Sequence, residues 1–173
     1  LLFTATNTGD IKVWQFPDDH DQQKKVLPVR NLIAHCDKVV ALKPISLEGD
    51  IVDEPSLLLS ASIDGSMAIW DIITGDLVYQ CELEHGITCA DIDQHTNTLF
   101  LGTTSGEVLC YRIEEMIVCA SQGMDCQIPN GKFLAHAEGT GVTAIQYGGE
   151  GNLGRKRPAM KTNTNTNTNA NSN

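Results

Sequence analysis

Short segments of alternating apolar and polar residues, separated by glycine turns, dominate residues 1–147 of this chain. The clearest example is LLLSASIDGSMAIWD at 57–71, where Asp64-Gly65 is a dipeptide suited to a tight hairpin between two strands. After the turn, successive side chains alternate between two faces. Before it, the run is apolar almost throughout, as expected for a strand that is covered on both faces. The pattern predicts an all-β protein.

The hairpin turn recurs at Gly9, Gly65 and Gly106, each five residues before an aromatic residue. The alternation around these turns predicts three groups of strands and the opening strand of a fourth. The expected strands are 1–6, 11–16 and 29–35, then 38–46, 57–63, 66–72 and 76–83, then 87–93, 98–104, 107–113 and 132–136, and finally 142–147. The three hairpin glycines lie 56 and 41 residues apart. Repeats of about 40–45 residues are typical of propellers, in which each repeat is one sheet, and the longer first interval is explained by insertions.

The second group carries the residue set of the WD40 repeat, namely a preceding His, a Ser-x-Asp turn and a closing Trp-Asp. Here these residues are His35, Ser62, Asp64, Trp70 and Asp71. The chain therefore resembles the WD40-repeat β-propeller family over residues 1 to about 147. The resemblance implies a partial propeller of about three blades plus the first strand of another. Because the chain starts without Met inside an expected strand, we expect a fragment of a longer protein.

Four of these residues, His35, Ser62, Asp64 and Trp70, predict a structural hydrogen-bond set. A buried Trp brings an indole N–H that needs an acceptor, and a Ser hydroxyl, a His ring and a turn carboxylate can relay hydrogen bonds from it. The same residue types occur in hydrolase triads, but the sequence supplies neither an exposed nucleophile nor an oxyanion hole. We therefore expect neither a catalytic site nor a cofactor.

The other two groups keep the glycine turn but lose part of the set. In the first group, Thr8 and Gln15 stand where the second group has its two Asp residues. In the third group, Ser105, Tyr111 and Arg112 replace Asp, Trp and Asp. We expect the complete hydrogen-bond set in the second group and the propeller fold in all three.

Long insertions leave the expected sheets from one end, at 17–28, 47–55, 114–130 and after 148. Insertions at one face of a repeat array often mark its binding face, although the same face can simply tolerate growth. The chain has a net charge of −10, and the first three insertions are acidic. Such a surface predicts protein partners with basic segments, and no direct nucleic-acid binding by the folded part; a solvated acidic loop is the alternative. The candidate partner-binding residues are Glu48, Asp50, Asp53, Glu54, Glu114 and Glu115.

Composition narrows the class of protein further. Six cysteines are scattered without a C-x-x-C pair, which favours reduced thiols in an intracellular protein of the nucleus or cytoplasm, not a secreted one. No apolar run is long enough for a membrane span, and no signal peptide opens the chain. Cys119, Cys126 and His136 lack a fourth zinc ligand and a standard spacing, so no metal is expected.

The segment 148–173 changes composition to a polar low-complexity tract, predicted to be a disordered tail or a truncated insertion. Gly149, Gly151 and Gly154 match the spacing of a dinucleotide loop, but the helix that this loop requires does not come after them. We therefore expect no nucleotide site. The domain division is 1–147 for the propeller fragment and 148–173 for the tail.

A finer resemblance rests on irregularities in two segments, 76–113 and 131–147. The first segment lacks the usual Gly-His before its first strand, has a small-residue turn, and precedes a long insertion before GKFLAHAEGTGVTAIQY. This pattern is similar to the WD-repeat subunit of the pre-60S complex that processes internal transcribed spacer RNA. That resemblance implies a scaffold in large ribosomal subunit biogenesis, with a nuclear location and basic neighbours.

Two other classes of function remain open. A substrate-receptor or signalling adaptor propeller of a ubiquitin ligase or kinase pathway would be indicated by an F-box or a degron-binding Arg cluster, and the sequence shows neither. An enzyme is the weakest hypothesis, because no paired carboxylates, metal cluster or nucleophile motif stands out.

Overall fold

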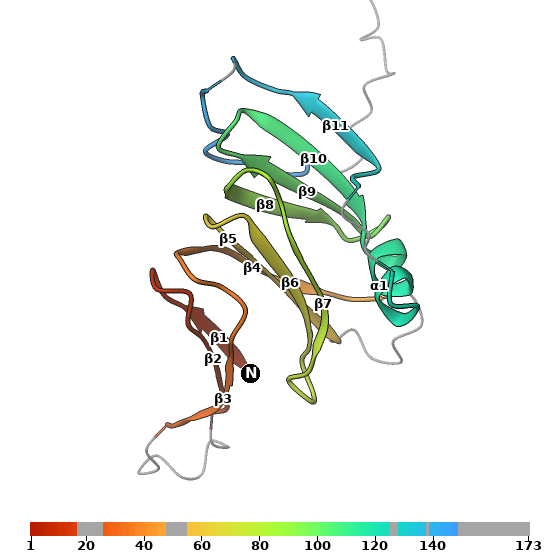
Figure 1. The fold of residues 1–173 in the computed structure, drawn as a ribbon. Coiled ribbons are helices and arrows are strands. Elements are labelled where there is room, and N and C mark those ends of the chain that lie inside the picture. The colour runs from red at the N-terminus through yellow and green to blue at the C-terminus, as the bar shows by residue number, and fades with distance from the viewer. Residues whose placement is uncertain (17–25, 48–54, 125–127, 138, 149–173) are drawn as a thin grey trace, which may run out of the picture.

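The computed structural model describes residues 1–16, 26–47, 55–124, 128–137 and 139–148. These residues form three antiparallel sheets that succeed one another along the chain, with one helix among the elements described. Figure 1 shows the sheets arranged in sequence order, with the first at the N-terminal end and the third beyond the second. The all-β prediction is therefore confirmed. The predicted tail lies outside the described residues, apart from Gly148.

Each sheet is a meander in which consecutive strands lie side by side. The first sheet contains β1 (Leu2–Ala5), β2 (Ile11–Trp14) and β3 (Pro28–Leu32). The second contains β4 (Val39–Ile45), β5 (Leu57–Ser62), β6 (Ser66–Asp71) and β7 (Leu77–Glu82). The third contains β8 (Ile87–Asp93), β9 (Thr98–Thr103), β10 (Glu107–Arg112) and β11 (Gly131–Leu134). These strands agree with the expected ranges to within a few residues at each end.

The three hairpin glycines have left-handed backbones, with φ of +89° at Gly9, +91° at Gly65 and +90° at Gly106. A Cβ at Gly65 would lie 2.8 Å from the carbonyl oxygen of Leu83, and a Cβ at Gly9 would lie 2.3 Å from that of His35. Glycine is therefore needed both for the turn and for the close approach of the loop that leads into the next sheet. The hairpins and these loops pack together at the same end of the sheets.

Two apolar layers hold the sheets together. Ile11 and Val13 of the first sheet pack with Leu58 and Trp70 of the second. On the opposite face of the second sheet, a larger layer extends to the third sheet and includes Tyr111. Because both faces of the second sheet are covered, every residue of β5 is buried, which explains its nearly continuous apolar sequence.

Helix α1 (Ile113–Ser121) lies within a stretch that the sequence pattern predicts only as an acidic insertion. Ile113 and Met116 are buried in the layer between the second and third sheets, and Ile117 and Ala120 pack against it. These four positions have the spacing of one helical face. The helix begins directly after β10 and packs beside β7, the last strand of the second sheet (Figure 1).

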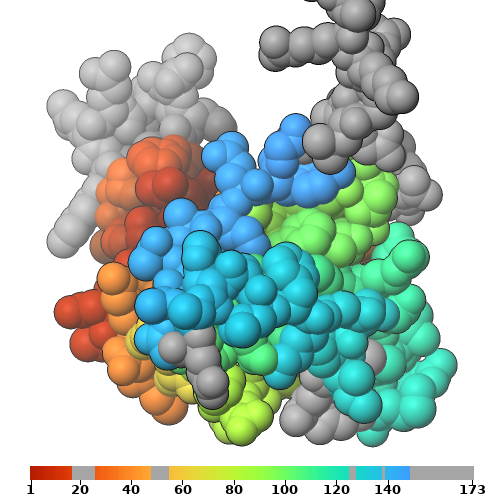
Figure 2. All heavy atoms as spheres, turned by 90° about the horizontal axis from the view of Figure 1, so that it is seen from above, coloured from red at the N-terminus to blue at the C-terminus, as the bar shows by residue number. Residues whose placement is uncertain are grey.

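The prediction of a regular strand at 142–147 is wrong, because this segment has no neighbouring strand of its own sheet to pair with among the residues described. It nevertheless lies along the third sheet, as Figure 2 shows from above (blue). The N–H of Val142 donates to the carbonyl of Thr103 at 3.0 Å, and the Phe100 and Tyr147 rings stack at 5.8 Å between centroids. The corresponding bond at the start of β4 joins Val39 to the first sheet.

A polar contact links the inner strands of successive sheets. Lys43 on β4 pairs with Asp91 on β8 at 2.9 Å, and Asp91 also accepts the N–H of Tyr147 at 2.6 Å. Burial opposes ionisation of Asp91, but the Tyr147 N–H and the Lys43 ammonium outweigh it and lower the pKa of the carboxyl. The segment 142–147 therefore docks on the third sheet through a charged group as well as through apolar contacts.

Candidate functional site

A chain of side-chain hydrogen bonds runs through the second sheet. The indole N–H of Trp70 donates to Ser60 Oγ at 2.9 Å, and Ser60 Oγ lies 2.7 Å from His35 Nε2. His35 Nδ1 lies 2.5 Å from Ser66 Oγ, which donates to Asp64 Oδ1 at 2.5 Å. This relay of hydrogen bonds therefore joins β6, β5 and the loop before β4, and it ends at Asp64 in the hairpin turn.

All hydrogen bonds of this relay are donated in one direction, which is set by the Asp64 carboxylate at its end. An ionised Asp64 only accepts hydrogen bonds, so the one hydroxyl proton of Ser66 must point toward it. Ser66 then accepts from His35 Nδ1–H, which leaves Nε2 as the acceptor for the hydroxyl of Ser60. Ser60 in turn accepts from Trp70. Every donor points toward Asp64, and the histidine is neutral with its proton on Nδ1.

The environment supports these protonation states. Burial alone would raise the pKa of Asp64, but hydrogen bonds from the hydroxyl and N–H of Ser66 and from the N–H of Cys36 lower it to about 2. Burial lowers the pKa of His35, and the nearby Asp64 carboxylate offsets part of that effect. The histidine is therefore held neutral between two serines.

The sequence pattern places Ser62 in this relay, and the structure corrects that assignment. Ser62 Oγ donates to the carbonyl of Lys38 at 3.0 Å and accepts the N–H of Asp64 at 3.2 Å, so it braces the hairpin turn against the start of β4. Ser60 and Ser66 occupy the relay instead. Their signal is present in the sequence: Ser60 lies ten residues before Trp70, as Thr4 lies ten residues before Trp14, whose indole N–H donates to it at 2.8 Å.

The middle residues of this relay are closed to solvent. Ser60 is 0% exposed, and His35 and Ser66 are also buried. A hydroxyl that is already bonded on both sides and closed to solvent has no path to a substrate. The arrangement gives hydrogen-bond partners to one indole, one imidazole and two hydroxyls that are buried inside the sheet.

Of the six acidic residues proposed to bind a partner, four lie outside the described residues: Glu48, Asp50, Asp53 and Glu54. The other two, Glu114 and Glu115, are exposed in the first turn of α1, where negative charge favours the helix. Glu115 accepts a hydrogen bond from the Asn130 side chain at 2.7 Å and lies 3.9 Å from Arg112 Nε. Glu114 lies 3.4 Å from the Asn97 amide nitrogen. The two acids therefore contribute to the structure around α1 while they face solvent.

The start of α1 and the first turn of the third sheet contact each other directly. The N–H of Ile113 donates to the carbonyl of Asn97 at 3.0 Å, and the Asn97 side chain reaches Glu114. The first and third connections of this sheet therefore lie at one end, opposite the glycine hairpin. For the third sheet, this places the insertion 114–130 where the sequence pattern predicts it.

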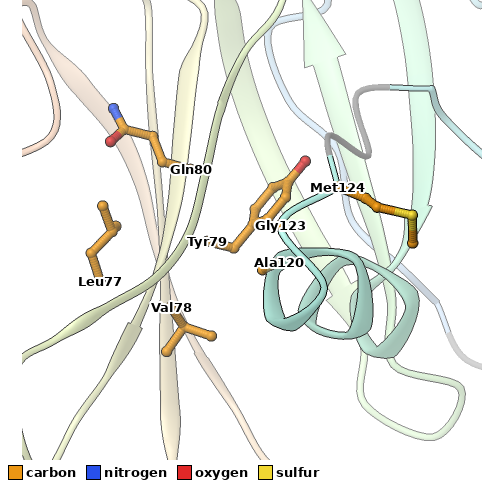
Figure 3. Close-up of a pocket in the computed structure, with 7 residues that line it drawn as sticks. All are labelled: Leu77, Val78, Tyr79, Gln80, Ala120, Gly123 and Met124. Atoms are coloured by element: carbon orange, nitrogen blue, oxygen red, sulfur yellow. The ribbon is translucent and has the colours of Figure 1, made fainter.

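A surface pocket of about 350 Å³ lies between β7 and the end of α1. We call it the rim pocket; it is lined by Leu77, Val78, Tyr79, Gln80, Ala120, Gly123 and Met124. Figure 3 shows Tyr79 between the strand and the helix, with Met124 on the helix side. Sequence reasoning misses this site, because its two halves are brought together by a helix that the pattern does not predict.

The described side chains form neither a metal centre nor a membrane span. Within the ranges that the structure describes, no group of three or more His, Cys, Asp and Glu side chains could hold a metal ion. Cys126, one of the residues considered for zinc, lies outside those ranges. None of the described helices has the length and apolar character needed to cross a membrane.

Comparison with known proteins gives one sequence relative and several structural ones. No protein-family model matches the chain. It is similar to the pre-rRNA-processing protein crb3/ipi3 of Schizosaccharomyces pombe, with 27% identity over 113 residues. The match covers 61% of this chain and 24% of the relative, so the chain spans about a quarter of that protein's length.

The structural relatives are WD40 domains. The WD40 domain of Toxoplasma gondii coronin matches with a TM-score of 0.50 and 16% identity, over 64% of this chain and 27% of the coronin chain. The C-terminal WD40 domain of Sif2 matches with a TM-score of 0.50 and 18% identity, over 68% of this chain and 29% of that chain. The three sheets therefore have the fold of consecutive WD40 propeller blades, as the sequence pattern predicts.

Proposed function

We propose that this chain is part of a non-catalytic WD40 scaffold that assembles proteins during large ribosomal subunit biogenesis, in the processing of pre-rRNA. WD40 propeller domains generally serve as non-catalytic scaffolds, and the fold of this chain is theirs. The observation that supports a role in pre-rRNA processing is the sequence similarity to a pre-rRNA-processing protein. We propose residues 1–147 as the propeller segment and 148–173 as a low-complexity tail.

The proposal assigns separate roles to the two sets of residues. The hydrogen-bonded chain that ends at Asp64, together with the turn brace at Ser62, stabilises the second blade. The acidic insertions, with Glu114 and Glu115 on α1, face partners. Negative charge repels phosphate, so we propose that protein partners with basic segments are bound and that RNA is not held directly.

The test uses the full-length protein in its own cells. An affinity tag is added at the chromosomal locus, complexes are purified at low salt, and co-purifying proteins are identified against an untagged control. The proposal predicts recovery of large-subunit assembly factors, a nuclear signal for the tagged protein, and accumulation of spacer-containing pre-rRNA on depletion. Recovery of ubiquitin-ligase or kinase components, with normal pre-rRNA, would replace this proposal with the adaptor alternative.

A further inference from the structure

The rim pocket lies where the last strand of the second sheet meets the end of a helix. β7 is the last strand of the second sheet, so one side of its backbone has no strand beside it in the described part of the chain. α1 ends beside it in a turn where the N–H of Met124 donates to the carbonyl of Cys119 at 2.9 Å. Gly123 in this turn has a φ of +67°. The pocket is therefore framed by backbone that two ordered elements hold in place.

The pocket presents apolar side chains to solvent. Met124 is 52% exposed and Leu77 is 45% exposed, while the buried Tyr79 lies between the strand and the helix (Figure 3). Val118, on the same helix, is also exposed. A methionine beside an aromatic ring is an adaptable surface for an incoming apolar side chain. Exposed apolar groups at a concave site favour binding of an apolar group.

The two stretches of chain that line the pocket are acidic, and Arg30 of β3 approaches them at one end, where it donates to the carbonyl of Ile72 at 3.3 Å. The stretches 72–86 and 113–124 contain five acidic residues and no Lys or Arg. The five are Asp76, Glu82, Glu84, Glu114 and Glu115. Of these five acids, only Glu115 forms an ion pair with a basic residue in the described part of the chain, with Arg112 at 3.9 Å. The last turn of α1 also lacks a basic residue to complement the negative end of its dipole. An occupant would therefore gain from carrying positive charge around its apolar group.

We propose that the rim pocket binds a protein partner through a segment in which one apolar side chain is flanked by Lys or Arg residues. The inference deepens the proposed scaffold function and depends on its protein-binding part alone. Phosphate groups and acidic peptides are disfavoured by the surrounding carboxylates. A second copy of this chain is disfavoured as well, since its net charge is also negative.

The test measures binding of defined peptides to the full-length protein by fluorescence anisotropy. The probe has one central Leu with two Lys residues on each side; the control probes replace Leu with Ser, or each Lys with Glu. We expect the Lys-Leu probe to bind more tightly than both controls, and its affinity to fall as salt rises. Equal binding of all three probes, or no binding, overturns the inference.

Variants locate the binding. Met124→Asp, and separately Val78→Ser, should weaken the probe about tenfold, and Glu82→Lys with Glu114→Lys should weaken it by a similar factor. Ile33→Asp, at a residue 82% exposed before β4, and Asp10→Lys on the first hairpin are the matched controls and should leave affinity unchanged. Circular dichroism and thermal unfolding check that each variant is folded. Unchanged affinity in the folded Met124 and Val78 variants overturns the inference.

Two further outcomes are separated by design. Reversal of the chain's own basic triplet, Arg155→Glu, Lys156→Glu and Arg157→Glu, should leave probe binding unchanged; binding only after reversal would mean that the chain fills its own pocket, and would overturn the inference. Co-purification of assembly factors tests the proposed function independently of the peptides. Peptide binding without assembly factors would therefore reject the pathway and keep the pocket, and the reverse result would reject the pocket alone.

Discussion

The hairpins of the second and third sheets have the same backbone but are tied down in different ways. In the second sheet, Trp70 donates through Ser60 to His35 and so reaches the loop that precedes the sheet. In the third sheet, buried Tyr111 stands in the place of the tryptophan, and Leu101, ten residues earlier, offers no hydroxyl. The second blade is therefore joined to the loop before it by a buried relay of side-chain hydrogen bonds, whereas the third is joined to the second by the Lys43–Asp91 pair and by the apolar layer that contains Tyr111.

The third hairpin compensates locally. Its turn serine, Ser105, lies 2.8 Å from Thr103 Oγ1 and donates to Glu107 at 3.2 Å. Glu107 pairs in turn with Lys132 on the neighbouring strand at 2.7 Å. These bonds stay within one sheet, whereas the chain in the second sheet connects residues 25 and 31 positions apart. The propeller fold therefore tolerates loss of the long-range chain when local bonds and packing remain.

The largest expected effect distinguishes the two aromatic residues. Trp70→Ala should lower the free energy of unfolding by about 3–5 kcal/mol, because it removes a large buried side chain and leaves Ser60 without its donor. Tyr111→Phe keeps the ring and should cost about 1 kcal/mol. Urea denaturation of the full-length protein measures both. Equal losses would show that the second blade is no more dependent on its aromatic residue than the third.

A second comparison sharpens the roles of the two serines. Ser60→Ala should cost about 1–3 kcal/mol, since it leaves a buried indole N–H and a buried imidazole nitrogen unpaired. Ser62→Ala should cost about 1 kcal/mol, because the groups it braces lie at a partly exposed turn. The midpoints of urea denaturation would rank them. A larger loss at Ser62 would contradict the relay described for the second sheet.

Mild acid should weaken the second blade first. Because folding lowers the pKa of His35 below its ordinary value near 6.5, the unfolded chain binds more protons, and stability falls as pH drops through 6.5. The contribution of Asp64 is complete above about pH 4 and is lost as pH falls toward 2. Denaturation midpoints from pH 8 to pH 5 should decline less steeply for His35→Gln than for wild type. Parallel curves would assign the decline to other groups.

The smallest effect on stability is expected at the acidic insertion. Changing Glu48, Asp50, Asp53 and Glu54 to Lys should shift the free energy of unfolding by no more than about 0.5 kcal/mol, because we expect the apolar core to need none of these four polar side chains. The same variant should reduce recovery of assembly factors from lysate, and more so at low salt than at high salt. If the wild type and the variant gave identical recoveries at both salt concentrations, the candidate binding surface would instead be the hairpin end of the sheets.

Most of the fold could be predicted because its signals are local. A glycine at each hairpin and alternation on each side fix where strands begin and end. The helix was not predicted, although Ile113, Met116 and Ile117 have helical spacing, because Ile113 was interpreted as the end of the preceding strand and the residues after it as a charged insertion. The rim pocket depends on that helix, so it was not predicted either. The pocket joins residues about 40 positions apart, and no single stretch of sequence encodes it.

The candidate hydrogen-bond set was predicted in kind but not in every member. His35, Asp64 and Trp70 are connected in the structure, yet the connecting hydroxyls belong to Ser60 and Ser66. Three serines within seven residues offer the same chemistry, and only strand register decides which of them faces the tryptophan. Residue types could be read from the sequence, whereas their pairing depended on the sheet.

The docked segment 142–147 has a consequence for how such a protein is built. It already binds Thr103, Asp91 and the ring of Phe100 although no strand of its own sheet lies beside it among the described residues. Each finished sheet can therefore act as a template that captures the first strand of the next, before that next sheet exists. Assembly would then proceed in chain order, one blade at a time, with the register of each new blade inherited from the blade before it.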